Sequence, residues 1–399
     1  MITLANLLLA ILAIPAAGAC AYLFALTVLS ARLPVPGRSS RRLRFDVIVP
    51  AHNEAAMIGR CLGNLRRLDW PAERWRLVVV ADNCQDATAQ IARDAGAHVL
   101  ERQDATQPGK GYALQFAFGH SRAAGRADAV VVVDADAEVS PNLLEAFAAR
   151  IERGEGAVQA HYGVLNPAES WRTRLIAIAH GAFHTVRSRA RERLRLSCGL
   201  RGNGWCVTHR VLEQVPYRAF SLTEDLEYGI ALGLAGHRVA YAGEAHADAD
   251  MASGEKIAQR QRQRWEDGRF DLIRSQILPL LRAALRQRSP VCLDLALDLL
   301  VLPLSYVALN VAALIAAAAL ASLWDASLRG WLWAGTACAA ALLIHVLRGA
   351  QLSGRGAAGL LDLLRAPLYI VWKMLRVLRS HDRGEWAPTR AGVTAREKP

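Results

Sequence analysis

The sequence lacks the cysteine spacing that marks a zinc site or a disulfide framework. Its seven cysteines contain no C-x-x-C pair, and three of them lie in or near long apolar stretches. Disulfides are rare where thiols are kept reduced, so the pattern is consistent with a reducing cytoplasm. The seven positions are Cys20, Cys61, Cys84, Cys198, Cys206, Cys292 and Cys338.

Two glycine motifs that bind phosphate are also missing. No G-x-G-x-x-G follows the first apolar strand, and no G-x-x-x-x-G-K-[ST] occurs in the chain. These absences argue against a dinucleotide-dependent oxidoreductase and against a P-loop ATPase.

Charge is absent from three long stretches. The first runs from Ile2 to Ser30, which is enough to cross a bilayer core of about 30 Å, and the others cover residues 299–324 and 331–347. A signal peptide is the alternative for the first stretch, but its apolar region is too long and no basic residue precedes it. We therefore predict transmembrane helices at residues 1–31, 295–324 and 331–348.

An arginine cluster follows the first predicted span. By the positive-inside rule it places the central domain in the cytoplasm and the N-terminus outside. The other two spans then cross outward and return, and Arg348 and Arg355 follow on the cytoplasmic side. We predict a multi-pass protein of the inner (cytoplasmic) membrane. The cluster comprises Arg32, Arg38, Arg41, Arg42 and Arg44.

The net charge of +12 raises the question of nucleic acid. The chain shows no helix-turn-helix, zinc-finger or aromatic RNA-binding signature. Arginines next to the membrane, facing anionic lipid, account for much of the charge. Nucleic acid is therefore not an expected partner, whereas membrane lipids are.

Two stretches mix leucine and arginine at roughly helical spacing. One covers residues 276–290 and the other residues 357–380, where Tyr369 and Trp372 could anchor a helix at the membrane surface. Packing against the soluble domain is the alternative for each. We predict two interfacial helices, with residues 381–399 as a cytoplasmic tail.

The central region, residues 45–275, alternates short apolar strands with helical segments. The strands are predicted in "FDVIVPAHNE", "RLVVVADNCQD", "AHVLER" and "ADAVVVVDADAEVSP". Such alternation predicts an α/β domain with a mostly parallel sheet covered on both faces. Ligands bind at the carboxyl ends of such strands. That edge is where His52, Asn53, Glu54, Asp82, Asp134 and Asp136 fall.

Asp134 and Asp136 form a D-x-D motif at the end of the fourth predicted strand. On an extended backbone both side chains would leave the same face, where two carboxylates repel each other unless a cation joins them. Mg²⁺ or Mn²⁺ suits oxygen ligands and keeps positions open for phosphate oxygens. An acidic loop at a strand end is the alternative, because this motif is short.

Four other motifs follow a consistent order along the chain. "PGKGYAL" places Lys110 between glycines, as a point charge suited to phosphate, and "CGLRGNGWCV" allows close backbone approach to a ligand. "SLTEDLEYG" contains Thr223, Glu224 and Asp225, which could equally form the capped first turn of a helix. "QRQRWEDGR" adds a basic helical segment.

Taken together, these motifs resemble the membrane-bound family 2 glycosyltransferases. The chain is similar to the branch that includes cellulose, hyaluronan and chitin synthases and ceramide glucosyltransferase. The resemblance covers residues 45–269 and implies a GT-A (Rossmann-like) domain flanked by transmembrane helices, with a hexosyl- or N-acetylhexosaminyltransferase activity. The donor would be a nucleotide sugar, usually UDP-linked, and the cofactor Mg²⁺ or Mn²⁺.

The resemblance also implies roles for individual residues. Asp225 would be the general base, with Glu224 beside it. Gln261, Arg264 and Trp265 would close over the diphosphate and the acceptor, next to Gly202, Asn203 and Gly204 of the glycine-rich loop. Donor-binding residues would be Pro50, His52, Glu54, Asp82, Lys110, Asp134 and Asp136, with Asp136 and Asp134 as the metal ligands.

The predicted activity is inverting transfer of one sugar to a lipid or lipid-linked saccharide, in exopolysaccharide or glycolipid assembly. Processive β-glycan synthesis is the alternative, because the Q-x-x-R-W motif suits it. Three spans argue against it, because they are few for a channel through which a polymer could cross the membrane. A membrane-anchored module that binds nucleotide sugars without catalysis is a third reading.

Three remaining features of the sequence are not assigned to the predicted site. His246, Asp248 and Asp250 read as a surface strand or loop rather than a metal site. His180 and His184 are four residues apart, with no third ligand evident. The run from Arg187 to Leu196 reads as a solvated or membrane-facing helix face, with contact to an anionic acceptor as the alternative.

Overall fold

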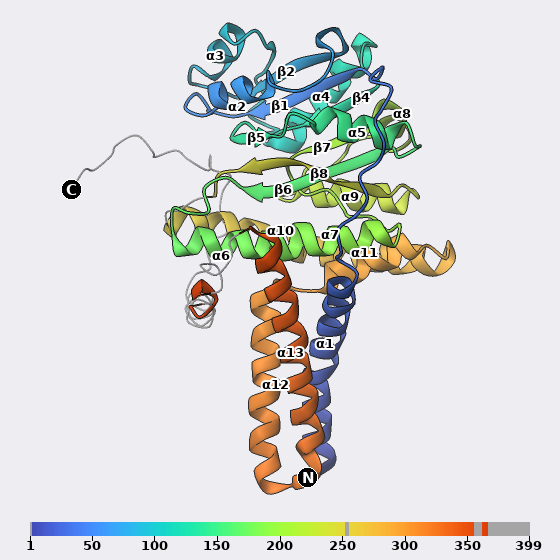
Figure 1. The fold of residues 1–399 in the computed structure, drawn as a ribbon, viewed down its shortest axis with the longest axis vertical. Helices are drawn as coiled ribbons and strands as arrows, with labels where there is room; N and C mark the ends of the chain where they lie inside the picture. The colour runs from blue at the N-terminus through green and yellow to red at the C-terminus, as the bar shows by residue number, and fades with distance from the viewer. Residues whose placement is uncertain (1, 252–254, 355–360, 366–399) are drawn as a thin grey trace, which may run out of the picture.

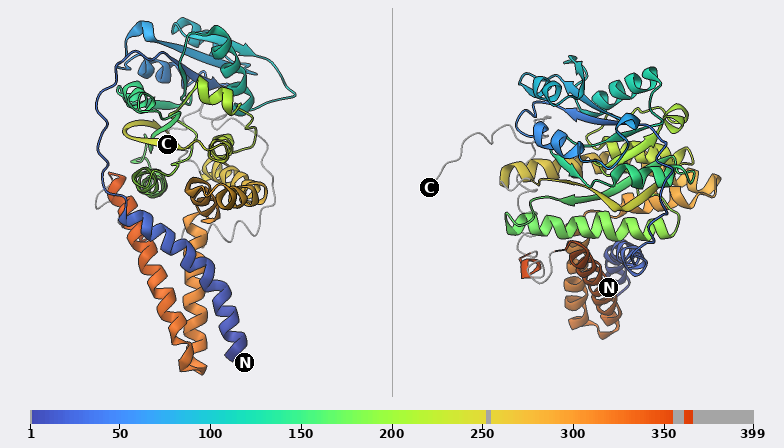
Figure 2. Two further views of the ribbon diagram at one scale, coloured as in Figure 1. Left: turned by 90° about the vertical axis from the view of Figure 1, so that its right-hand side faces the viewer. Right: turned by 45° about the horizontal axis from the view of Figure 1, so that its top comes forward.

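The computed structural model describes residues 2–251, 255–354 and 361–365, and the side chains of the tenth helix, α10, from Gln263 onward. A sheet domain lies at one end of the molecule and a stalk of three long helices at the other (Figure 1). Between them lies a layer of helices that run roughly across the stalk (Figure 2).

The described residues form one eight-stranded sheet in the order β3-β2-β1-β4-β7-β6-β8-β5. The first four strands in this order are mutually parallel, as predicted. Beyond them the sheet is mixed, because β7 is antiparallel to both β4 and β6 and β5 is antiparallel to β8, whereas β6 and β8 are parallel. The strands are β1 (Phe45–Ala51), β2 (Trp75–Asp82), β3 (His98–Arg102), β4 (Ala129–Val132), β5 (Ala137–Val139), β6 (Ala157–Val164), β7 (Trp205–Thr208) and β8 (Val239–Ala249).

Two apolar cores cover the faces of this sheet. The runs of Val and Ile in β1, β2 and β4 alternate between the two cores, so both faces are buried, which explains their continuous hydrophobicity. Helices α2 (Ile58–Leu65), α3 (Thr88–Asp94) and α5 (Leu143–Ile151) contribute to one core. Helices α4 (Lys110–Ala124), α8 (His209–Gln214) and α9 (Glu224–Leu234) contribute to the other.

The transverse layer consists of two helical segments. In the first, α6 (Trp171–His180) continues through a π-helical turn (Gly181–Val186) into α7 (Arg187–Arg193). In the second, α10 (Glu255–Arg286) is followed by α11 (Pro290–Leu300). π-Helical turns occur often at functional sites, because the extra residue re-aims side chains within a helix.

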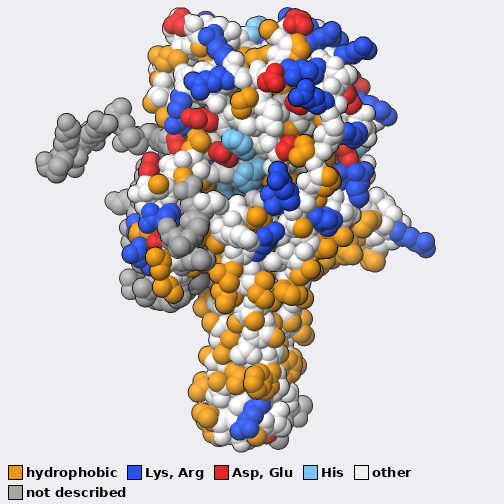
Figure 3. Space-filling view, viewed as in Figure 1, with side chains coloured by type: hydrophobic (Ala, Val, Ile, Leu, Met, Phe, Trp, Pro, Cys, Tyr) orange, Lys and Arg blue, Asp and Glu red, His pale blue; other side chains and the backbone are white. Residues whose placement is uncertain are grey.

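The stalk consists of α1 (Ile2–Val28), α12 (Leu304–Trp324) and α13 (Arg329–Leu352). In the described residues these are the three helices long and apolar enough to cross a membrane. Hydrophobic side chains cover the stalk, whereas Lys and Arg gather on the domain above it (Figure 3). Polar pairs tie the helices together: His345 Nδ1 lies 2.7 Å from Thr27 Oγ1, and Trp331 Nε1 donates to Asn6 Oδ1 at 2.8 Å.

The stalk meets the transverse layer at a glycine contact. A Cβ atom on Gly349 of α13 would lie 2.7 Å from Ala182 Cβ in the π-helical turn. We expect Gly349→Val to destabilise the protein by about 1–3 kcal/mol, because overpacking forces the two backbones apart. Thermal unfolding in detergent measures the effect. Gly18→Val is the control, since nothing lies within 4 Å of a Cβ at Gly18, and equal melting temperatures for the two variants would contradict the prediction.

Several element boundaries differ from those predicted. The stretch predicted as one span from residue 295 to 324 forms two helices, since the chain leaves the helical conformation at Val301 and α12 starts only after Pro303. The predicted boundary between domain and interfacial helix at residue 275 falls inside the continuous helix α10. Most of the second predicted interfacial helix and the whole of the tail lie outside the described residues.

Candidate functional site

A cavity of about 780 Å³ lies at the carboxyl ends of the parallel strands. All seven predicted donor-binding residues line it, as do Glu224, Asp225, Gly202, Arg264 and Trp265. Its far wall is formed by the stalk helices, through Leu304 and Ala308 of α12 and Leu342 and Val346 of α13. The cavity therefore connects the acidic strand ends with apolar helix surface.

The strand ends are held by local hydrogen bonds. His52 Nδ1 lies 2.7 Å from the carbonyl oxygen of Asp82, which ties the end of β1 to the end of β2. The Asp82 carboxylate accepts from Arg102 Nη1 at 2.6 Å and is almost fully buried. Asp82 is therefore fixed in place, with its charge balanced by Arg102.

Lys110 joins three of the predicted motifs. Its Nζ lies 2.6 Å from Asp134 Oδ1 and 3.4 Å from Glu224 Oε1. The same ammonium donates to the carbonyl oxygen of Gly202 at 2.7 Å. Gly109 precedes it with φ of 121°, a backbone conformation that suits glycine, and α4 starts at Lys110 itself. The lysine thus brings the D-x-D motif, the glycine-rich loop and the T-E-D motif to one point.

The charges at this point shift each other's protonation. Burial disfavours the charged form of Lys110, but the Asp134 and Glu224 carboxylates outweigh burial and raise the pKa of the ammonium. The pKa of Asp225 is raised to about 7, mainly by burial. The negative charge of Glu224 also raises this pKa, whereas the positive charge of Lys110 lowers it. A carboxyl whose pKa is near neutral suits proton transfer at physiological pH.

Asp134 and Asp136 lie in a turn rather than on a strand. β4 ends at Val132, and the amide of Ala137 donates to the carbonyl oxygen of Asp134 at 3.1 Å. The prediction that both side chains share a face of an extended backbone is therefore wrong in its geometry. The physical reason is that the chain must bend here to begin β5. Both residues still line the cavity.

The glycine-rich loop supports this turn from behind. Asn203 is fully buried, and its Oδ1 accepts from the amide of Asp134 at 3.0 Å. Gly204 packs against Ala247 so closely that no side chain would fit. Only Gly202 of the three predicted loop residues lines the cavity. Asn203 and Gly204 are thus placed to position the turn, and Gly202 to contact a ligand.

The two carboxylates fit a divalent metal that completes its coordination elsewhere. Within the described residues no group of three or more His, Cys, Asp or Glu side chains is arranged to hold a metal. Mg²⁺ is commonly held by one or two carboxylates together with substrate phosphates and water. Asp134 and Asp136 supply such a pair, although one oxygen of Asp134 is also paired with Lys110.

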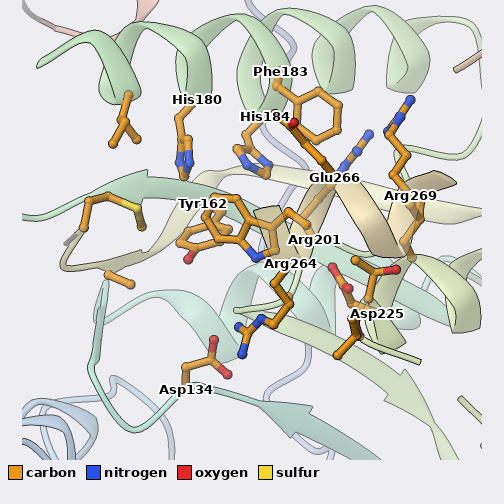
Figure 4. Close-up of a pocket in the computed structure, with 18 of the residues that line it drawn as sticks. Asp134, Tyr162, His180, Phe183, His184, Arg201, Asp225, Arg264, Glu266 and Arg269 are labelled. Carbon is orange, nitrogen blue, oxygen red and sulfur yellow. The ribbon is translucent and has the colours of Figure 1, made fainter. Parts of the chain in front are cut away.

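The Q-R-Q-R-W motif lies on α10, over the cavity. Arg264 extends toward Asp134 (Figure 4), and Trp265 packs at the edge of a sheet core. The helix is docked through Gly268, where a Cβ atom would lie 2.9 Å from Thr223 Oγ1. The side chain of Gln261 lies outside the described residues. α9 begins at Glu224 as the capping alternative predicted, but the Thr223 side chain makes no capping hydrogen bond.

The structure adds a set of residues that sequence reasoning did not place in the site. His180, His184 and Arg187 line the cavity from the transverse layer, together with Arg201 and Arg269. The first three recur at i, i+4 and i+7, a spacing that indicates one helix face. The expectation of a solvated or membrane-facing run is wrong for Arg187 and Arg191, which are 2% and 0% exposed.

Family comparison agrees with the motifs. The model of the family described as "Glycosyltransferase like family 2" matches residues 43–268. The Bacillus subtilis protein named "Probable glycosyltransferase YdaM" is 25% identical over 234 residues, covering 56% of this chain and 55% of that protein. "Beta-monoglucosyldiacylglycerol synthase" of Synechocystis is 27% identical over 234 residues, covering 56% of this chain and 47% of that protein. The chain thus matches about half the length of these curated relatives.

A solved structure shows the same fold. It is titled as mannosyltransferase PcManGT from Pyrobaculum calidifontis in complex with GDP-Man and Mn²⁺. The TM-score is 0.53 at 18% identity, and the match covers 86% of this chain and 98% of that one. The likeness concerns the fold alone.

Proposed function

The chain belongs to glycosyltransferase-like family 2, and we propose that it transfers one sugar from a nucleotide-sugar donor to a lipid or lipid-linked saccharide. The donor is of the UDP-sugar class and the transfer inverting, so an α-linked donor gives a β-linked product. The reaction takes place at the cytoplasmic membrane face, in exopolysaccharide or glycolipid assembly. The predicted GT-A domain is confirmed by the fold.

One observation carries this proposal: a single cavity has a charged end and an apolar end. The charged end contains Lys110, Asp134 and Asp225, and the apolar end is formed by α12 and α13 of the stalk. A nucleotide sugar suits the first end and a lipid suits the second. The similarity to a protein named as a glucosyldiacylglycerol synthase also supports a lipid acceptor.

The residues then divide the chemistry between them. Asp225 takes the proton from the acceptor hydroxyl as that oxygen attacks the anomeric carbon. Lys110 and Arg264 stabilise the negative charge that develops on the departing diphosphate. Asp136 and Asp134 would hold Mg²⁺ or Mn²⁺, whose charge supports the same leaving group. Glu54 and Asp82 bind the nucleoside at the strand ends.

The membrane position follows from the stalk and its flanks. Three candidate spans support a multi-pass arrangement, with the sheet domain on the side of the Arg32–Arg44 cluster. The transverse layer then lies at the level of the lipid headgroups, where a hydroxyl on a membrane lipid can reach Asp225.

Processive β-glycan synthesis remains the second candidate. Arg264 and Trp265 of the Q-x-x-R-W motif line the cavity and could also grip a growing chain. Another relative, of Arabidopsis thaliana, is named "Probable glucomannan 4-beta-mannosyltransferase 11" and is 23% identical over 248 residues. Product length, measured by mass, separates the two activities.

A donor panel tests the proposed function. The full chain in detergent is given UDP- and GDP-sugars with Mn²⁺ and an extract of membrane lipids, and release of the nucleoside diphosphate is followed. We expect release from at least one UDP-sugar, with label appearing in the lipid fraction. Absence of turnover with every donor would reject a glycosyltransferase activity. Label only in long water-soluble products would favour the processive alternative.

A further inference from the structure

The wall of the cavity contains a cluster of buried arginines. Arg187 of α7, Arg201 before β7 and Arg269 of α10 all line the cavity. Arg187 is 2% exposed and Arg201 is 6% exposed. These three guanidiniums come from separate elements and all approach Asp298 of α11. Arg201 and Arg269 are labelled in Figure 4.

Too few carboxylates balance these arginines. Asp298 Oδ1 is 3.0 Å from Arg187 and 2.7 Å from Arg191, and Asp294 Oδ2 is 2.8 Å from Arg191. Arg201 Nη2 approaches Asp298 only to 3.7 Å. Among the described residues, the carboxylates of Asp294 and Asp298 thus face four guanidiniums, those of Arg187, Arg191, Arg201 and Arg269.

Glu266 on the same wall does not close the difference. Its Oε2 accepts from Tyr306 Oη at 3.1 Å. Asp225 also interacts with Arg201, but because its pKa is raised to about 7 it carries only part of a negative charge at neutral pH. Among the described residues, three carboxylates and a partly charged Asp225 thus face four arginines. Arg269 donates to the backbone carbonyl oxygens of Asp298 and Val301, and the described residues give it no ion pair. A cation that is buried without a partner costs free energy, so an excess of this kind calls for an anion.

Three residues that line the cavity have side-chain nitrogens without a hydrogen-bond partner among the described residues. Within the part of the chain that the structure describes, these buried nitrogens are Nε of Arg187, Nε of Arg269 and Nδ1 of His184. The guanidiniums of Arg187 and Arg201 instead lie 4.9 Å and 4.1 Å from the centre of the Phe183 ring. An aromatic face is a weaker partner for a guanidinium than a phosphate or carboxylate oxygen.

The pKa values of these arginines and of His184 are consistent with their burial in the cavity wall. Burial lowers the pKa of Arg187 and of Arg201, and it lowers the pKa of Arg269 to about 10. Burial, together with neighbouring His180 and Arg201, holds the pKa of His184 well below its usual value, so this imidazole is neutral. An anion bound here would offset the effect of burial and raise these arginine pKa values again.

We infer that the acceptor lipid carries a phosphoryl group, which binds Arg187, Arg201 and Arg269, as well as a free hydroxyl, which reaches Asp225. This inference rests on the proposed function and narrows its acceptor class. A neutral diacylglycerol lacks the anion. A glycerophospholipid whose headgroup has a hydroxyl, or a saccharide linked to a lipid through pyrophosphate, has both groups.

Matched acceptors test the inference on the unaltered chain. With the donor that turns over, transfer is compared for phosphatidylglycerol, a pyrophosphate-linked lipid saccharide and diacylglycerol in phosphatidylcholine vesicles. We expect kcat/KM to be at least about 10-fold higher for one of the two anionic acceptors than for diacylglycerol. This is the gain expected from one hydrogen bond between a charged arginine and a phosphoryl oxygen. Which of the two is used identifies the source of the phosphoryl group. An equal or higher value for diacylglycerol overturns the inference.

Variants distinguish a built site from general attraction to an anionic surface. Arg201→Gln should raise the KM for the anionic acceptor about 10- to 100-fold and the donor KM far less, and Arg201→Lys should recover part of the loss. Arg189→Gln is the control, because Arg189 lies on α7 two residues after the cavity-lining Arg187 but does not itself line the cavity, and it should change neither KM. A larger rise in donor KM than in acceptor KM for Arg201→Gln would assign the arginines to the donor and overturn the inference.

The two proposals fail in different ways. If no nucleotide sugar releases its diphosphate with any acceptor or with water, the proposed function is wrong. If donors turn over but the charge of the acceptor makes no difference, only the inference about its phosphoryl group is wrong. Should Arg201→Gln fail to fold, the comparison of acceptors on the unaltered chain decides alone.

Discussion

Asp225→Asn is expected to lower kcat by about 10²- to 10⁴-fold, the usual contribution of a general base. The amide keeps the size of the carboxylate but cannot accept the proton of the acceptor hydroxyl. A Cβ on Gly202 would lie 3.6 Å from Asp225 Oδ2, so the glycine-rich loop lies directly beside the carboxylate. Transfer of labelled sugar measures the loss, and thermal unfolding confirms that the variant is folded. A variant as active as the parent would remove Asp225 from the mechanism.

The pH dependence gives the same assignment a second test. Because the base must be deprotonated, kcat should rise with pH through an apparent pKa near 7. Because folding raises the pKa of Asp225, this carboxyl stabilises the folded state at pH values below its pKa in the unfolded chain. This contribution to stability is lost as the pH rises through about 7. Activity and this part of the stability therefore change in opposite directions.

Two neighbouring substitutions should move the pH profile in opposite directions. Lys110 opposes the raised pKa of Asp225, so Lys110→Met should move the rising limb to higher pH. Glu224 adds to the raised pKa, so Glu224→Gln should move the limb to lower pH. Shifts of the same sign, or no shift in either variant, would assign the limb to a different group.

The sequence predicted the first half of the sheet because its physical signal is local. Runs of Val and Ile that end in polar residues at His52, Asp82 and Asp134 indicate parallel strands whose ends meet. The mixed half of the sheet gave no comparable signal: β5 has three residues, and the pairing of β7 between β4 and β6 depends on contacts distant in sequence. Register of this kind is set by tertiary packing.

The sequence predicted which motifs belong to the site, but not how their side chains are arranged in space. The motif order predicted that Lys110, Asp134 and Asp225 belong together, but not that the lysine bridges to Glu224. The sequence did not predict Arg201 as a site residue, because its loop was interpreted through its glycines. It did not predict Arg187 either, because the surrounding run resembles the solvated face of a helix. Burial decides the role of an arginine, and burial depends on α11 and the stalk, whose docking the sequence does not reveal.

Asp136→Asn is expected to lower kcat/KM by about 10²- to 10³-fold, the range for loss of one group that stabilises developing charge. Asp136 lies in the turn that Asn203 supports and lines the donor end of the cavity. Without its charge, a divalent cation would keep only Asp134, one oxygen of which is already paired with Lys110. Higher Mn²⁺ concentrations should therefore restore part of the activity of the variant.

Removal of the metal should have the same effect on the parent. EDTA should abolish transfer, and added Mn²⁺ or Mg²⁺ should restore it, with Mn²⁺ binding in the presence of UDP measured directly by calorimetry. Glu138→Gln is the matched control, because Glu138 lies two residues further along, pairs with Arg60 at 3.4 Å and does not line the cavity. Full activity in EDTA would contradict the assignment. So would a Mn²⁺ affinity that is equal in Asp136→Asn and the parent, since the charge of Asp136 would then have no cation to hold.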